Sequence, residues 1–186
     1  MTDIDLLHYE NESWSQGYSN VSGIDEVGRG PIAGPVVASA VSFKPNFIQK
    51  TYNTIFKKIN DSKKLNQKLR KYFYELLIDC EYVNIGTDFV DSVQIDKINI
   101  LQSTHLAMKN AACKINTDFI LIDGLPVKDL PSPSRNIIKG DTLSISIAAA
   151  SIISKVKRDE WMIEIDKIYP QYGFAKHKGY GTKEHI

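Results

Sequence analysis

Segment 23–34, GIDEVGRGPIAG, constrains the fold most, because two adjacent carboxylates end one apolar run and a glycine-rich turn starts the next. The run that follows, PVVASAVSF, is rich in β-branched residues, so the segment predicts a strand, a tight turn and a second strand. Successive side chains of a strand point to opposite faces. Asp25 and Glu26 can therefore serve one site only where the strand bends or frays, which the nearby glycines permit.

Two other interpretations of this segment fit less well. A plain hairpin needs one or two glycines for its turn, whereas Gly28, Gly30 and Gly34 surround the cation Arg29 here. A dinucleotide-binding loop has a similar glycine spacing, but that loop opens a helix that binds phosphate. Here Pro35 begins a strand-like run, and the two carboxylates would repel phosphate unless a metal lay between. The segment therefore favours a site with chemistry of its own.

Length and composition predict one domain with a sizeable core, covering residues 1–186. We expect residues 1–20 to be a peripheral segment with a short helix near residues 6–12. No apolar stretch approaches the roughly 20 residues that span a bilayer, and no signal peptide is recognisable, so we expect a cytoplasmic protein. The two cysteines are far apart, which favours free thiols over a disulfide or a zinc site.

The net charge of +1 hides an uneven distribution, since no lysine or arginine precedes Arg29. A basic run occupies residues 57–71 and comprises Lys57, Lys58, Lys63, Lys64, Lys68, Arg70 and Lys71. Such a run is usually a solvated helix face. A second basic group lies among aromatics near the end of the chain: Lys176, Lys178 and Lys183 with Tyr172, Phe174 and Tyr180. Interleaved basic and aromatic residues suit a polyanion whose sugars or bases can stack.

Strand and helix patterns alternate along the chain, which predicts an α/β fold. Asn66 is placed to cap a helix that reaches about residue 79. The remaining predictions are a helical turn near 55–59, a strand at 81–89, one or two helices in 91–115, buried and short strands at 118–122 and 136–138, and a long helix from 141 to about 168.

Carboxylates stand at three places: the pair Asp25 and Glu26, then Asp123 after a buried strand, and Asp141 at a helix start. Gathered together they would repel one another, and two divalent cations would relieve the repulsion. Oxygen ligands favour Mg²⁺ or Mn²⁺, and two such ions suit displacement at a phosphodiester. Taken singly, Asp141 is better explained as a helix N-cap and Asp123 as a turn residue. Asp159 would lie roughly 27 Å along the helix from Asp141, so we predict a salt bridge for it.

The segment GIDEVGRGPIAGPVVASAV resembles the N-terminal motif of type 2 ribonuclease H, the bacterial ribonuclease HII family. Further blocks of that family follow in its order: DSKKL at 61–65, INIL at 98–101, LIDG at 121–124, KGD at 139–141 with IAAASIISKVKRD after it, and GYGT at 179–182. The blocks cover nearly the whole chain from about residue 9. The resemblance implies a ribonuclease H-like fold, with a mixed central β-sheet flanked by helices.

The same resemblance assigns roles to residues of this chain. It implies that two Mg²⁺ or Mn²⁺ ions are held by the catalytic acids Asp25, Glu26, Asp123 and Asp141. It implies that substrate is bound by Gly28, Arg29, Gly30, Ser62, Lys63, Lys64, Asn99 and Tyr180. In this scheme the glycine turn reads the 2′-hydroxyl and adjoining phosphate, which requires the close backbone approach that glycine allows. Tyr180 stacks on the next sugar, although alone it is equally an ordinary loop aromatic.

The expected function is therefore that of a metal-dependent endoribonuclease. Its expected substrates are RNA-DNA hybrids and duplex DNA with embedded ribonucleotides, cut on the 5′ side of the ribonucleotide to leave 5′-phosphate and 3′-hydroxyl ends. The implied cellular roles are removal of misincorporated ribonucleotides and of primer RNA. We expect no membrane and no nucleotide cofactor, since the chain has no phosphate-binding Gly-x-x-x-x-Gly-Lys loop and no Gly-x-Ser-x-Gly elbow.

Two alternatives remain at this level. A non-catalytic hybrid-binding module is one, although intact acids argue against it. A type 3 ribonuclease H is the other, and Arg29 between two glycines and the absence of an N-terminal extension favour type 2. Many relatives continue into a C-terminal helical tail, so the end at Ile186 predicts a weaker substrate grip with unchanged chemistry. The choice of Mg²⁺ or Mn²⁺, the oligomeric state and protein partners such as a sliding clamp are open.

Overall fold

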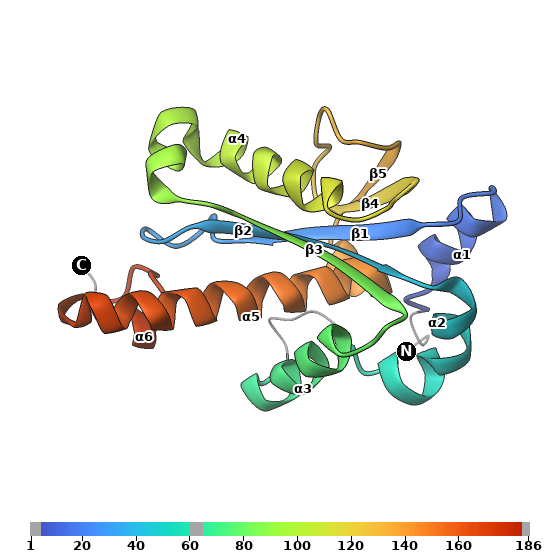
Figure 1. The fold of residues 1–186 in the computed structure, drawn as a ribbon, viewed down its shortest axis with the longest axis horizontal. Helices are drawn as coiled ribbons and strands as arrows, with labels where there is room; N and C mark the ends of the chain where they lie inside the picture. The colour runs from blue at the N-terminus through green and yellow to red at the C-terminus, as the bar shows by residue number, and fades with distance from the viewer. Residues whose placement is uncertain (1–4, 60–64, 184–186) are drawn as a thin grey trace.

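A computed structural model describes residues 5–59 and 65–183 of the chain. Its centre is a five-stranded mixed sheet in the order β3-β2-β1-β4-β5, and helices cover both faces (Figure 1). The strands are β1 (Val21–Val27), β2 (Val36–Phe43), β3 (Val83–Val90), β4 (Phe119–Asp123) and β5 (Ser134–Ile137). The predicted α/β class, with a mixed sheet flanked by helices, is confirmed.

The β1–β2 hairpin is the predicted strand, turn and strand. The two strands are antiparallel and pair from Ser22 opposite Ser42 to Val27 opposite Val37. β2 is buried along its whole length, which explains its β-branched and small side chains. On its other side β1 runs parallel to β4, so the carboxyl ends of these two strands meet at one edge of the sheet.

Helix α4 lies on one face of the sheet, and α5 lies on the other with α3 (Figure 1). The helices are α1 (His8–Ser15), α2 (Pro45–Thr51), α3 (Gln67–Ile78), α4 (Ser92–Cys113), α5 (Ile145–Ile168) and α6 (Phe174–His177). Shorter turns are the π-helix η1 (Tyr52–Phe56) and the 3-10 helices η2 (Gly140–Thr142) and η3 (Pro170–Tyr172). Within the described ranges, no helix has the length and apolarity that a bilayer crossing requires.

Several predicted boundaries are confirmed and two are wrong. Asn66 caps α3, since its side chain accepts a hydrogen bond from the Leu69 N–H at 2.9 Å. The long helix starts at Ile145 instead of residue 141, and its N-cap is Ser144. The N-cap interpretation of Asp141 is therefore wrong, because Asp141 lies in η2. The helical turn expected near 55–59 belongs to a longer helical stretch that begins at Pro45.

The prediction that residues 1–20 are peripheral is wrong for the part that the structure describes. Leu6 and Leu7 are buried in the core, and Glu10 on α1 is 1% exposed. The Leu6 N–H donates to the Tyr52 hydroxyl at 3.1 Å, and the Leu6 carbonyl accepts from the Ile145 N–H at 2.8 Å. The segment is thus bonded to the first residue of α5. The short helix expected near residues 6–12 is present as α1.

Gly23 sets how closely β1 approaches α5. A Cβ atom at this position would lie 2.2 Å from the backbone nitrogen of Ile147, so an alanine would push strand and helix apart. We expect Gly23→Ala to lower the free energy of unfolding by about 3 kcal/mol, near the upper end of the usual overpacking cost. Thermal unfolding measures the loss, with Gly30→Ala as the matched control because its new methyl would meet only the Tyr180 ring at 3.9 Å. Equal unfolding temperatures for the two variants would contradict the prediction.

Candidate active site

Parallel pairing of β1 and β4 brings two of the predicted acids together. The register places Ile24 opposite Ile122, so Asp25 and Asp123 follow side by side at the carboxyl ends of their strands. Asp25 is 5% exposed and Asp123 is half-buried. Buried apolar residues precede both acids, which is why each strand delivers its carboxylate at the sheet edge.

Glu26 joins this pair where β1 approaches its end. Its backbone N–H donates to Asp25 Oδ1 at 2.7 Å, and its half-buried carboxylate lies 3.5 Å from the guanidinium of Arg29. Glu26 and Asp123 are also close enough for their charges to interact. The pairing of β1 with β2 continues through both acids to Val27, so the strand does not fray at this point, and the service of both acids in one site stays a prediction.

The fourth acid, Asp141, reaches the site through η2. The Gly140 N–H donates to Asp123 Oδ1 at 2.6 Å, and Asp141 is the next residue along the chain. A side chain at position 140 would overlap the Ile147 side chain, whose Cδ1 lies 2.5 Å from where a Cβ would be. Asp141 is 5% exposed. Because η2 is bonded to Asp123, the backbone of Asp141 lies beside the end of the sheet that carries Asp123.

Burial and repulsion between neighbouring carboxylates raise the pKa values of Asp25 and Glu26. Burial raises the pKa of Asp25 well above its ordinary value, the charges of Glu26 and Asp123 raise it further, and a hydrogen bond from Ser151 opposes them. Burial also raises the pKa of Glu26, while Arg29 lowers it and Asp123 raises it. The site therefore concentrates negative charge that a cation would stabilise.

The donor set fits a hard divalent cation. Every candidate ligand is a carboxylate oxygen, and oxygen ligands suit Mg²⁺ and Mn²⁺. Across residues 5–59 and 65–183, no three His, Cys, Asp or Glu side chains are already arranged closely enough to hold a metal. Asp25, Glu26 and Asp123 thus interact through their charges at one end of the sheet without forming a ready-made metal cage.

The raised pKa values predict an unusual pH dependence of stability without metal. The folded state takes up protons at Asp25 and Glu26 at a higher pH than the unfolded chain does, so the free energy of unfolding should rise as pH falls from 7 toward about 4.5. Buried Glu10 acts in the same direction. Chemical unfolding in chelator at several pH values measures the slope. Mg²⁺ or Mn²⁺ should flatten it, and stability that falls over this range in chelator would contradict the prediction.

The turn after β1 packs against the segment that carries Tyr180. Gly28 adopts φ +114°, and a Cβ there would lie 2.4 Å from the Pro35 carbonyl oxygen, so this turn requires glycine. The Ile32 N–H donates to the Gly179 carbonyl at 2.9 Å. A methyl group on Gly30 would lie 3.9 Å from the ring of Tyr180, which is 41% exposed. The turn predicted to recognise the 2′-hydroxyl therefore lies next to Tyr180, the residue predicted to stack on a sugar.

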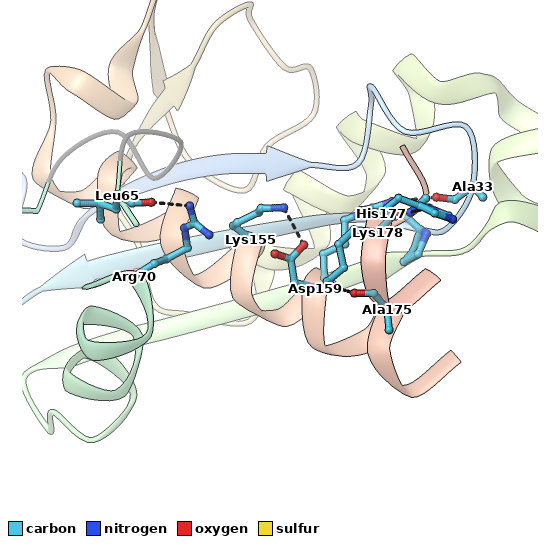
Figure 2. Close-up of polar contacts among 11 residues, drawn as sticks. Ala33, Leu65, Arg70, Lys155, Asp159, Ala175, His177 and Lys178 are labelled. Carbon is cyan, nitrogen blue, oxygen red and sulfur yellow. Dashed lines mark hydrogen bonds and ion pairs between the residues drawn. The ribbon is translucent and has the colours of Figure 1, made fainter. Parts of the chain in front are cut away.

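Arg158 is a residue of this region whose position the sequence did not predict. Its side chain is fully buried, and its guanidinium donates to the carbonyl oxygens of Pro35, Ala33 and Lys178, each at 2.9 Å. Figure 2 shows Ala33 close to Lys178 beside α5. Burial lowers the pKa of Arg158, against the charges of Tyr180 and Asp159. One side chain thus ties the turn after β1 to the segment that leads to Tyr180.

Arg158 and Asp159 are neighbours in the sequence, and a salt bridge is predicted for Asp159. The Asp159 carboxylate accepts a hydrogen bond from Lys155 at 2.7 Å, one turn earlier on α5 (Figure 2). The predicted salt-bridge role of Asp159 is confirmed. No sequence pattern distinguishes an arginine that binds backbone carbonyls from one that faces solvent, so only the fold identifies Arg158.

Of the remaining predicted substrate residues, the structure describes only Asn99. Ser62, Lys63 and Lys64 lie outside the described residues, so their phosphate contacts stay a prediction. Asn99 adopts φ 67° and kinks α4, and its Oδ1 accepts from the Leu101 N–H at 3.0 Å and the Gln102 N–H at 3.1 Å. Its oxygen thus caps the second part of α4, and a substrate contact by Asn99 also stays a prediction.

Part of the basic run is a helix surface. Lys71 on α3 is exposed and lies 3.8 Å from Glu75, and Arg70 donates to the Leu65 carbonyl at 2.8 Å (Figure 2). Lys71 therefore lies on a solvated helix face, as expected for a basic run. Phosphate binding by the other lysines of this run remains a prediction.

Comparison with known proteins gives a consistent family assignment. The model of the ribonuclease HII family matches residues 22–186. The ribonuclease HII of Chlamydia trachomatis serovar A is 50% identical over 182 residues, covering 96% of this chain and 79% of that protein. Among solved structures, ribonuclease H2 from Pyrococcus horikoshii OT3 has a TM-score of 0.72 at 24% identity, covering 88% of this chain and 82% of that one. Bst-RNase HIII in complex with Mn²⁺ has a TM-score of 0.65 at 21% identity, covering 81% and 55%.

Proposed function

This chain belongs to the ribonuclease HII family of endoribonucleases, which act on RNA-DNA hybrids with the help of metal ions, and we propose that it cuts on the 5′ side of ribonucleotides in such hybrids and in duplex DNA. The products would carry 5′-phosphate and 3′-hydroxyl ends. The whole chain would act as one catalytic domain, in the cytoplasm. The matching family is ribonuclease HII, so type 2 ribonuclease H is favoured over the alternative of a type 3 ribonuclease H.

One observation carries the proposal: two parallel strands place Asp25 beside Asp123, and Gly140 bonds η2 with Asp141 to the same carboxylate. Buried, mutually repelling carboxylates are costly for a protein that only binds nucleic acid. A polyanionic substrate would also be repelled unless cations stood between. The arrangement therefore favours catalysis with metal over the alternative of a hybrid-binding module.

The metal ligands in this proposal are Asp25, Glu26, Asp123 and Asp141. Two Mg²⁺ or Mn²⁺ ions would supply activation of water and stabilisation of the departing oxygen. The chain itself orients the ligands: the Gly140 N–H fixes Asp123, and the Ser151 side chain and Glu26 N–H hold Asp25. Arg29 balances part of the charge of Glu26.

Selection of ribonucleotides is assigned to the turn after β1 and to Tyr180. Gly28 and Gly30 lie in the turn directly after the strand that carries Asp25 and Glu26; Gly28 is buried and Gly30 is exposed, so the exposed backbone at Gly30 suits a hydrogen bond to a 2′-hydroxyl. Arg29 is half-exposed and can reach a phosphate. The exposed Tyr180 beside Gly30 offers a ring for the neighbouring sugar, which is the reading favoured over an ordinary loop aromatic.

Cleavage of an end-labelled DNA duplex that carries one ribonucleotide tests the proposal. With Mg²⁺ or Mn²⁺ we expect one cut on the 5′ side of the ribonucleotide, and none in chelator or in an all-DNA duplex of the same sequence. An RNA-DNA hybrid should also be cut. Binding without cleavage under either metal would favour the hybrid-binding module, and the absence of binding would contradict the nucleic-acid assignment.

A further inference from the structure

Glu10 on α1 is a buried acid outside the group of four. It is 1% exposed, and it lies in the part of the chain before residue 22, where the family match begins. Its Oε1 accepts three hydrogen bonds: from the Ser144 hydroxyl at 2.6 Å, the Ser146 hydroxyl at 2.5 Å and the Ser146 N–H at 3.0 Å. Among the described residues, Oε2 is buried with no hydrogen-bond partner. Such a costly carboxylate calls for a purpose beyond packing.

These bonds hold the N-terminus of α5. The first N–H groups of a helix lack partners within it. Here the Ile145 N–H donates to the Leu6 carbonyl, the Ser146 N–H to Glu10, and the Ile147 N–H to the Ser144 side chain at 3.2 Å. The N-terminal segment therefore supplies two of the three caps. A carboxylate is also the favoured charge at this end of a helix.

A short path of hydrogen bonds leads from this cap to the active site. The hydroxyl of Ser144 donates to Glu10, and the backbone N–H of the same residue donates to the Gly140 carbonyl at 2.8 Å. The Gly140 N–H in turn donates to Asp123 Oδ1 at 2.6 Å, and Asp141 follows Gly140 directly. Movement at Ser144 would thus reach two of the four acids. We propose that Glu10 is a positioning residue, which fixes the junction of η2 and α5 and so places Asp123 and Asp141 for metal binding.

This inference rests on the proposed function, since it takes Asp123 and Asp141 to be metal ligands. It predicts that loss of Glu10 disturbs the metal site while the substrate-reading surface stays intact. The turn after β1 and Tyr180 are held by Arg158 instead. Removal of groups that orient metal ligands typically weakens metal binding by about 10- to 100-fold.

The test compares Glu10→Ala with Glu10→Gln and with Glu12→Ala. The amide of Glu10→Gln keeps an oxygen that can accept the Ser146 N–H. Glu12 lies on the same helix and forms a partly exposed ion pair with Arg135 at 2.9 Å, so it is the matched control. Titration of the chain with Mn²⁺ alone, followed by calorimetry, gives the metal affinity without any reaction. Cleavage kinetics give kcat and KM, and thermal unfolding shows that each variant is folded at the assay temperature.

We expect Glu10→Ala to bind Mn²⁺ about tenfold more weakly and to lose about tenfold in kcat, following the usual effect of such supporting groups, with KM changed less than about twofold. Glu10→Gln should recover most of both losses, and Glu12→Ala should match the native chain. If Glu10→Ala does not fold, Ser146→Ala removes one of the three donors to Glu10, the Ser146 hydroxyl, and should weaken Mn²⁺ binding in the same direction.

Mn²⁺ affinity of folded Glu10→Ala equal to that of the native chain would overturn the inference, and so would an equal loss in Glu12→Ala. A native chain that binds Mn²⁺ but cuts no hybrid would contradict the proposed function alone, because the Mn²⁺ titrations of the variants would still decide the role of Glu10. A native chain that does not bind Mn²⁺ would overturn the inference.

Discussion

Asp25→Asn should abolish cleavage while making the metal-free protein more stable. The substitution keeps the shape of the side chain but removes a metal ligand and a charge. A metal ion contributes several kcal/mol to such reactions, so a loss of roughly 4 kcal/mol predicts about a thousandfold slower cleavage. Stability should rise in chelator at neutral pH, because the native state no longer buries a charge that Glu26 and Asp123 repel.

Single-turnover cleavage and chemical unfolding in chelator measure these two effects on the same protein. Binding of a labelled RNA-DNA hybrid in chelator should be unchanged or tighter, since one negative charge beside the phosphates is gone. Asp159→Asn is the control, because its ion pair with Lys155 lies outside the acid cluster and such pairs contribute about 1 kcal/mol or less. Cleavage by Asp25→Asn within tenfold of the native rate would contradict the assignment of Asp25.

Arg158→Met should cause the largest loss of stability among the variants considered. The methionine fills part of the same volume but leaves three buried carbonyl oxygens, of Ala33, Pro35 and Lys178, without their donor. Breaking a buried charged network by removing one partner costs about 3 to 5 kcal/mol. We also expect a higher KM for hybrid substrates, because the turn after β1 and the segment before Tyr180 lose their common tie.

Chemical unfolding and the dependence of the cleavage rate on hybrid concentration test this prediction. Arg135→Met is the matched control, since Arg135 is partly exposed and pairs with Glu12 at the surface. A stability within about 1 kcal/mol of the native value, the range of surface ion pairs, would show that Arg158 does not hold the two segments.

Local physical rules explain most of what could be predicted. Apolar runs and turn residues gave the β1–β2 hairpin, β3, β4 and the Asn66 cap of α3, because each depends on neighbours in the chain. The start of α5 was misplaced because both Asp141 and Ser144 are good N-cap residues. Ser144 is the cap, and its hydroxyl is bonded to Glu10, which lies far away in the sequence. The polar composition of the N-terminal segment predicts a peripheral position, because composition does not show that Leu6, Leu7 and Glu10 are buried against α5.

The sequence by itself determined the α/β class, the identity of the four acids as candidates and, through its resemblance to a known family, the expected chemistry. Only the tertiary structure decided how these residues meet. Parallel pairing sets Asp25 beside Asp123, a glycine N–H fixes Asp123, and buried Arg158 joins two distant segments. Such contacts depend on which strands become neighbours and which polar groups are left to be satisfied in the interior. Local sequence patterns predict neither strand pairing nor buried polar contacts, because both join parts of the chain that are far apart in the sequence.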